Sequence, residues 1–66
     1  MKVQVNNKEI EIHSSTTITQ LTEKLEIPSV GSAIAVNNQL ISRSQWASHS
    51  LKENDDIVII QAACGG

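Results

Sequence analysis

Only one stretch of this sequence, residues 17–28, spaces its apolar residues as an α-helix does. Ile18, Leu21 and Leu25 recur at intervals of three and four, which places them on one helix face that can be buried. The other positions are expected to face water: Thr22, Glu23, Lys24 and Glu26. With a single helix available, the rest of the fold has to be built from extended segments.

Both ends of this helix carry local signals. Thr17 and Gln20 have the spacing of a capping box, in which each side chain bonds to the backbone N–H of the other residue. Pro28 disfavours the α conformation at Ile27, so the helix is expected to end there. The sequence therefore predicts a helix that begins just after Thr17.

Two short runs before the helix alternate polar and apolar residues, as a half-buried β-strand does. Val3 and Val5 are the apolar positions of the first run, and Ile10 and Ile12 those of the second. Residues 6–8, Asn-Asn-Lys, separate the runs and favour a hairpin turn because Asn tolerates positive φ. The chain is expected to open with a β-hairpin.

Three more extended segments follow the helix. Residues 33–36 are short and partly β-branched, the Asn pair at 37–38 indicates a second tight turn, and residues 40–41 would form the return strand. Residues 54–56 form a further turn signal before the apolar run Ile57-Val58-Ile59-Ile60, which is typical of a central strand. A loop around Gly31 would connect the helix to the first of these strands.

The order strand, strand, helix, strand, strand, irregular segment, strand is that of a β-grasp fold. It predicts an α+β domain over residues 1–61, with a mixed sheet of four to five strands packed over one main helix. In this topology the first and last strands are parallel neighbours in the middle of the sheet. Residues 43–50 are expected to form a loop or one helical turn in which Trp46 covers the sheet edge. The small residues 62–66 are expected to form a flexible C-terminal tail.

Composition excludes several classes of function. A net charge of -2, five Lys and Arg residues in all and a single aromatic residue argue against nucleic-acid binding. The alternating N-terminal residues are unlike a signal peptide or a membrane span, so a cytoplasmic protein is expected. One cysteine cannot form an internal disulfide, and no Cys or His spacing suits zinc. With 39% hydrophobic residues in 66, little is left to enclose a substrate or cofactor pocket, which argues against a self-contained enzyme.

The end of the chain offers the clearest chemistry, because two of the three glycines are Gly65 and Gly66. A terminal carboxylate becomes a good electrophile once it is converted to an acyl adenylate, and glycine has no Cβ to crowd the carbonyl carbon. Two glycines in succession can also thread a narrow channel into the active site of another enzyme. Gly66 is therefore the predicted reactive residue, and Gly65 is expected to give it flexibility and access.

The whole chain resembles the ubiquitin-like sulfur carriers, most closely the ThiS family of thiamin biosynthesis. The resemblance covers the length of the chain, the segment 34–41, Arg43 and Trp46, the segment 56–59, and the Gly65-Gly66 end. It implies that Gly66 is adenylated with ATP by a ubiquitin-activating-like adenylyltransferase and then converted to a thiocarboxylate. The sulfur would come from cysteine, through a donor such as a cysteine desulfurase, and thiazole synthase would use it.

The same resemblance sets the register of the last strand, counted back from the glycine pair. Ile57 and Ile59 would meet Leu21 and Leu25, which leaves Val58 and Ile60 on the open face of the sheet. An exposed apolar pair beside a reactive end suits transient docking. The predicted partner-binding residues are Val58, Ile60, Ala62, Ala63 and Cys64.

Two positions depart from the family pattern. Asn54 stands where such carriers often have Gly, and Asn is an acceptable substitute in the left-handed region. Cys64 stands where many relatives have a small residue, and its role is open between tail packing and exchange with the activated carboxylate. Within the same chemistry, the small subunit of molybdopterin synthase or a carrier for tRNA or protein thiolation remains an alternative. A β-grasp interaction module without chemistry is the alternative from another class.

Other polar residues carry weaker signals. His13 and His49 are far apart in sequence and are expected to be surface residues. Residues 14–17 are explained by the helix entry, because no partnered base is visible for a hydroxyl nucleophile. The carboxylates of Asp55 and Asp56 are expected to lie in water. Arg43 could bind a partner carboxylate or pack its stem beside Trp46.

Overall fold

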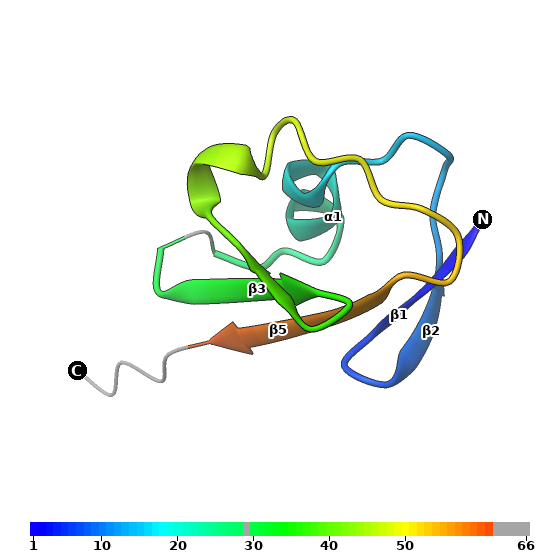
Figure 1. Ribbon diagram of the computed structural model, residues 1–66, viewed down its shortest axis with the longest axis horizontal. Coiled ribbons are helices and arrows are strands. Elements are labelled where there is room, and N and C mark those ends of the chain that lie inside the picture. Colours follow the sequence, from blue (N-terminus) through cyan, green and yellow to red (C-terminus); the bar gives the residue numbers. More distant parts are fainter. Residues whose placement is uncertain (29, 62–66) are drawn as a thin grey trace.

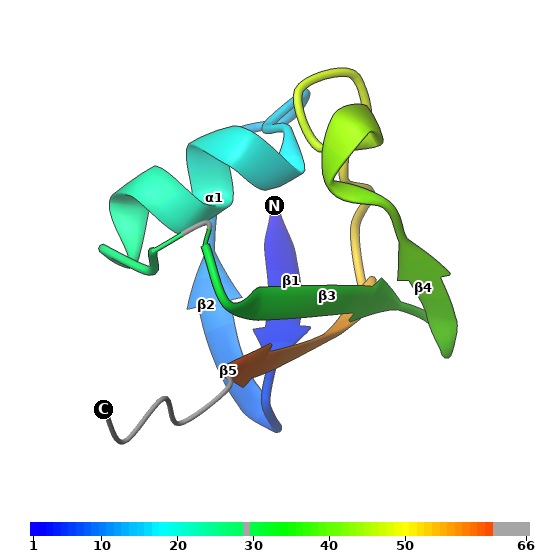
Figure 2. The same ribbon diagram turned by 90° about the vertical axis from the view of Figure 1, so that its left-hand side faces the viewer.

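The computed structural model describes residues 1–28 and 30–61 and contains a mixed sheet with one α-helix on one of its faces (Figures 1 and 2). The strands occur in the spatial order β2-β1-β5-β3-β4. β5 is central, parallel to β1 and antiparallel to β3. The elements are β1 (Lys2–Val5), β2 (Lys8–Glu11), α1 (Ile18–Lys24), β3 (Ser32–Val36), β4 (Gln39–Ile41), a 3₁₀ turn (Arg43–Gln45) and β5 (Asp56–Gln61). The predicted α+β β-grasp order is confirmed.

Both hairpins turn on a pair of asparagines. Asn6 and Asn7 have φ of 51° and 68°, and Asn37 and Asn38 have φ of 53° and 69°. Positive φ at both central residues is the geometry of a type I′ turn, whose twist matches that of the strands. The first turn is one residue shorter than the predicted 6–8, because Lys8 already pairs with Val5.

The helix begins as predicted. The Thr17 hydroxyl accepts a hydrogen bond from the Gln20 N–H at 3.2 Å, and the Gln20 side chain accepts one from the Thr17 N–H at 2.9 Å. Ile18 and Leu21 are fully buried. The prediction that Thr22 faces water is wrong: it is buried, and its hydroxyl donates to the Thr19 carbonyl at 2.7 Å. That bond lets a polar residue widen the buried face of the helix. Among the described residues no helix has the length and apolar character to cross a membrane.

The end of the helix differs from the prediction. α1 stops at Lys24, before Pro28 could act, and Glu26 follows with φ of 57°. The Glu26 N–H donates to the Glu23 carbonyl at 3.2 Å and the Ile27 N–H to the Thr22 carbonyl at 2.9 Å. These two bonds form a Schellman motif, which requires a left-handed residue at the position of Glu26. The backbone cap therefore ends the helix.

Replacing Glu26 with glycine is expected to raise the free energy of unfolding by about 0.5–1 kcal/mol, because a side chain at positive φ is strained and glycine is not. Urea denaturation measures the change. Glu26→Ala is the matched control: it removes the same charge but keeps Cβ, so it should not stabilise the protein. Equal stabilisation by both variants would mean that the charge, and not the backbone, is responsible.

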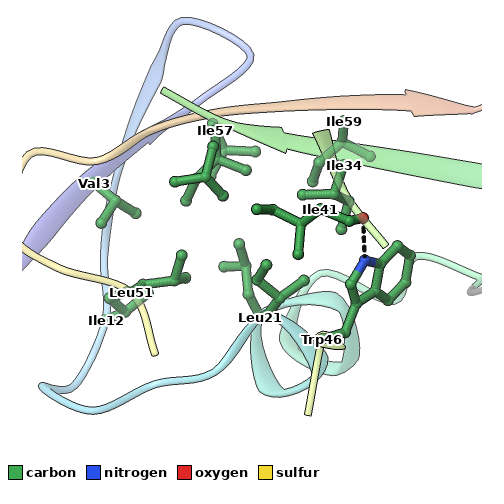
Figure 3. Packing of buried hydrophobic residues seen from close by; sticks show 12 residues of the cluster. Val3, Ile12, Leu21, Ile34, Ile41, Trp46, Leu51, Ile57 and Ile59 are labelled. Atoms are coloured by element: carbon green, nitrogen blue, oxygen red, sulfur yellow. Dashed lines mark hydrogen bonds between the residues drawn. The ribbon is translucent and has the colours of Figure 1, made fainter. Parts of the chain in front are cut away.

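The core lies between α1 and the sheet and is closed by residues from the long segment before β5 (Figure 3). Trp46 is buried there, and its indole Nε1 donates to the Ile41 carbonyl of the edge strand β4 at 3.1 Å. The predicted role of Trp46 at the sheet edge is confirmed. The buried hydrophobic residues are Val3, Val5, Ile12, Ile18, Leu21, Ile34, Val36, Ile41, Trp46, Leu51, Ile57 and Ile59.

The turn before β5 corrects the expectation that both Asp55 and Asp56 lie in water. Asn54 has φ of 68°, as the predicted left-handed turn requires. Asp56 is exposed, but Asp55 is buried, and its carboxylate accepts from the Lys52 N–H at 2.8 Å and from Asn37 Nδ2 at 3.0 Å. These two hydrogen bonds compensate the buried carboxylate for the loss of water. Through the bond to Asn37, Asp55 links this turn to the second hairpin.

Candidate functional site

Strand β5 presents different side chains to its two faces. Ile57 and Ile59 belong to the buried cluster that contains Leu21, and Leu25 packs against that cluster. Val58 and Ile60 point the other way and are 37% and 59% exposed. The predicted register of β5 is confirmed, and with it the outward position of two predicted partner-binding residues.

The exposed pair on β5 continues across the two neighbouring strands. Val58 pairs with Ala35, which pairs with Leu40, while Ile60 pairs with Ala33. Paired residues on adjacent strands share a face of the sheet. The result is an apolar surface on the side opposite α1, here called the outer patch: Ala33, Ala35, Leu40, Val58 and Ile60.

Three members of the outer patch were not predicted from the sequence, Ala33, Ala35 and Leu40, and Leu40 is the most exposed of them. It is 70% exposed, although it was expected only as part of a short return strand. A signal was present, because a two-residue turn at 37–38 pairs Val36 with Gln39 and therefore Ala35 with Leu40. Since Ala35 and Val58 are also paired, Leu40 has to lie on the open face.

The other half of the open face is polar. Gln4 of β1 pairs with Glu9 of β2 on one side and with Asp56 of β5 on the other, and Lys2 pairs with Glu11. These five side chains are exposed. An apolar centre beside a polar border is the usual composition of a protein-binding surface. The open face over β5, β3 and β4 is therefore a candidate docking site.

Two residues of the outer patch, Val58 and Ile60, belong to β5, the strand that leads to the predicted reactive end. β5 ends at Gln61, which pairs with Ser32. The predicted tail, 62–66, and the predicted site residues Ala62, Ala63, Cys64, Gly65 and Gly66 lie outside the described residues. Gly66 is six positions after Ile60, so an extended chain would span at most about 20 Å between the two residues.

The other polar residues considered from the sequence do not form a second functional site among the described residues. Thr16 Oγ1 donates to the His13 carbonyl at 2.6 Å and Thr17 caps α1, so this segment serves the helix entry. Within residues 1–28 and 30–61, no three His, Cys, Asp or Glu side chains are grouped in a way that could hold a metal ion. Arg43 lies exposed in the 3₁₀ turn beside Trp46. The outer patch and the residues after Gln61 remain as the candidate site.

A protein-family model described as the ThiS family matches residues 2–66, which includes both terminal glycines. The chain belongs to the ThiS family. It is similar to the sulfur carrier protein ThiS of Escherichia coli (strain K12), with 32% identity over 66 residues and complete coverage of both chains. This ThiS-family chain is therefore a small sulfur carrier, and a carrier implies activating and sulfur-transfer partners.

Solved structures show the same fold. The crystal structure of the thiamine biosynthesis protein ThiS from Geobacter metallireducens superposes with a TM-score of 0.85 at 20% identity, covering all of both chains. The solution structure of a thiamine biosynthesis protein from the same organism gives 0.79 at 19% identity, covering all of this chain and 88% of the other. The ThiS-family chain is thus a ubiquitin-like β-grasp protein.

Proposed function

We propose that this protein carries sulfur for the formation of the thiamin thiazole, on the carboxylate of Gly66. The observation that carries the proposal is the family match, which continues through Gly65 and Gly66. The outer patch supports it, because an apolar surface on the strand preceding these glycines can hold the domain while its end enters a partner. The domain acts as a co-substrate and not as an enzyme.

The chemistry would take place on partner enzymes, as adenylation of the carboxylate followed by displacement of AMP by sulfur. A Gly66 carboxylate oxygen attacks the α-phosphorus of ATP, pyrophosphate leaves, and an acyl adenylate forms. A sulfur nucleophile derived from cysteine then attacks the carbonyl carbon, and AMP leaves with the carboxylate oxygen. If the nucleophile is a persulfide, a second thiol then attacks the donor sulfur of the resulting acyl disulfide. The S–S bond breaks, the thiocarboxylate leaves, and the thiol and the donor sulfur remain as a disulfide. Glycine suits both attacks because it has no side chain beside the carbonyl.

Three partner enzymes would supply the ATP-binding site, the sulfur and the final reaction. A ubiquitin-activating-like adenylyltransferase binds the ATP, a cysteine desulfurase or similar donor provides the sulfur, and thiazole synthase consumes the thiocarboxylate. All three must reach the same terminal residues, so they cannot bind at once. Transient docking through a small patch allows this exchange, since the buried area and affinity can remain modest.

Reconstitution with purified partners tests the pathway. The thiocarboxylated protein should support thiazole formation by thiazole synthase, whereas the same protein with an ordinary carboxylate should not. Molybdopterin formation by the large subunit of molybdopterin synthase is the matched control reaction. A thiocarboxylated protein that supports the second reaction and not the first would contradict the thiazole assignment.

Replacing Cys64 with alanine is expected to leave the rate of sulfur acceptance within about twofold of wild type, because a small residue serves equally well in the tail. Intact mass recorded over time measures the rate. A severe loss of thiolation with unchanged binding to the activating enzyme would show that the Cys64 thiol takes a covalent part.

A further inference from the structure

The carboxamide of Asn6 forms two hydrogen bonds to one residue of the central strand. Asn6 Oδ1 accepts from the Ile59 N–H at 2.8 Å, and Asn6 Nδ2 donates to the Ile59 carbonyl at 3.3 Å. The two residues are 53 positions apart in the sequence. One side chain therefore bonds both the backbone N–H and the backbone carbonyl of Ile59.

The parallel ladder between β1 and β5 explains why a side chain is needed at this point. The Gln4 N–H donates to the Asp55 carbonyl and the Asn6 N–H to the Ile57 carbonyl, each at 2.9 Å. By the register of Gln4 with Asp56, a further step would bond the Ile59 N–H to the Asn6 carbonyl and the Ile59 carbonyl to the N–H of residue 8. The chain instead turns at Asn6 and Asn7, and Lys8 pairs with Val5 in the hairpin. The Asn6 carboxamide takes the place of the backbone carbonyl and N–H that the turn withdraws from the ladder.

Asn6 marks the last point at which β5 is held from the β1 side. Beyond it, Ile60 and Gln61 are paired only with Ala33 and Ser32 of β3. Val58 and Ile60, the predicted partner-binding side chains of β5, lie on either side of Ile59 in the sequence. The position of Asn6 thus determines how far β5 remains a central strand before the chain continues to the glycines.

The two other turn asparagines provide an internal comparison. Asn7, in the same turn and with φ of 68°, makes no side-chain hydrogen bond among the described residues. Asn37, in the second hairpin, holds the opposite end of β5: its Oδ1 accepts from the Asp56 N–H at 2.9 Å and its Nδ2 donates to the Asp55 carboxylate. The same residue type therefore fixes the start of β5 through one hairpin and its end through the other.

We propose that Asn6 is a positioning residue for sulfur transfer: it keeps the end of β5 in the sheet and so fixes the point from which the reactive end extends. This inference rests on the proposed carrier function. A protein without the Asn6 carboxamide would still dock through the outer patch, but its terminal carboxylate would reach the adenylation site less often in the reactive position.

The test compares Asn6→Gly with Asn7→Gly. Glycine accepts the positive φ at either position, so the two variants differ mainly in the carboxamide. Native-state amide exchange should speed up about tenfold or more at Ile59 in Asn6→Gly alone, as expected when a pair of local hydrogen bonds is lost. Asn37→Gly should affect the Asp56 amide instead.

The same variants are then assayed for adenylation and thiocarboxylate formation with the activating enzyme, at a temperature where all of them are folded. For Asn6→Gly, kcat should fall about fivefold or more while KM stays within about twofold. Asn7→Gly and Asn37→Gly should keep both parameters near wild type. Asn6→Asp, which keeps the acceptor for the Ile59 N–H, should recover part of kcat.

Either measurement can overturn the inference. Unchanged exchange at Ile59 in Asn6→Gly would show that the carboxamide does not hold β5. Faster exchange with unchanged kcat, or an equal loss of kcat in Asn37→Gly, would reduce Asn6 to a stability role. A wild-type protein that accepts no sulfur would instead refute the carrier function, and exchange at Ile59 would still decide whether Asn6 holds the strand.

Discussion

Replacing Ile59 with alanine is expected to lower the free energy of unfolding by about 2–5 kcal/mol, the usual cost of truncating a large buried aliphatic side chain. Ile59 is only 8% exposed and packs in the core cluster with Leu21. A domain of this size has a total stability of roughly 3–10 kcal/mol. The variant should therefore be partly unfolded near physiological temperature, which urea denaturation followed by circular dichroism would measure.

The neighbouring residue should behave in the opposite way. Ile60→Ser is expected to change stability by less than about 1 kcal/mol, because Ile60 is 59% exposed, and to weaken binding to the activating enzyme. Leu40→Ser should weaken the same binding, although Leu40 is on a different strand. Val30→Ser is the matched control, since Val30 is 77% exposed but lies in the loop before β3. Unfolding by Ile60→Ser but not by Ile59→Ala would reverse the assignment of the two faces.

Deleting Gly66 is expected to abolish thiocarboxylate formation and to leave the melting temperature unchanged. The shortened chain still ends in a glycine carboxylate, but that group is displaced by about 3.5 Å, the length of one residue. Such a displacement is enough to remove the carboxylate from in-line attack on ATP. Pyrophosphate release by the activating enzyme measures the loss directly.

Adding one alanine after Gly66 provides the complementary variant. It moves the carboxylate in the other direction and places a Cβ next to the reacting carbonyl, so adenylation should again be lost. Both variants should still compete with wild type for the activating enzyme through the outer patch. Normal adenylation of either variant would show that the position of the terminal carboxylate is not what the partner recognises.

Local sequence signals were sufficient for most of the fold. The capping box at Thr17, the Asn pairs of the two hairpins and the alternation along β5 each depend on residues within a few positions of one another. Such signals specify turns, caps and faces before any tertiary contact forms. They were enough to predict the order of the strands along the chain. Alternation along β5 showed that one pair of side chains faces outward, and the resemblance to ubiquitin-like folds identified that pair as Val58 and Ile60.

The burial of Asp55, the contact of Asn6 and the position of Leu40 depend on segments that are distant in the sequence. Asp55 is buried because Asn37, 18 residues away, donates to it, and the role of Asn6 depends on Ile59. Leu40 joins the outer patch only once β3 lies between β4 and β5. Glu26 shows a different difficulty, because a backbone cap can end a helix at a residue that is not glycine.

The intact mass of the protein after incubation with the activating enzyme, ATP, cysteine and a cysteine desulfurase tests the carrier function most directly. A carrier should gain the mass difference between sulfur and oxygen, only when ATP is present, and fragmentation should place the change on Gly66. An unchanged mass under conditions in which a known ThiS protein is converted, or a change located elsewhere in the chain, would contradict a sulfur carrier that works through its terminal glycine.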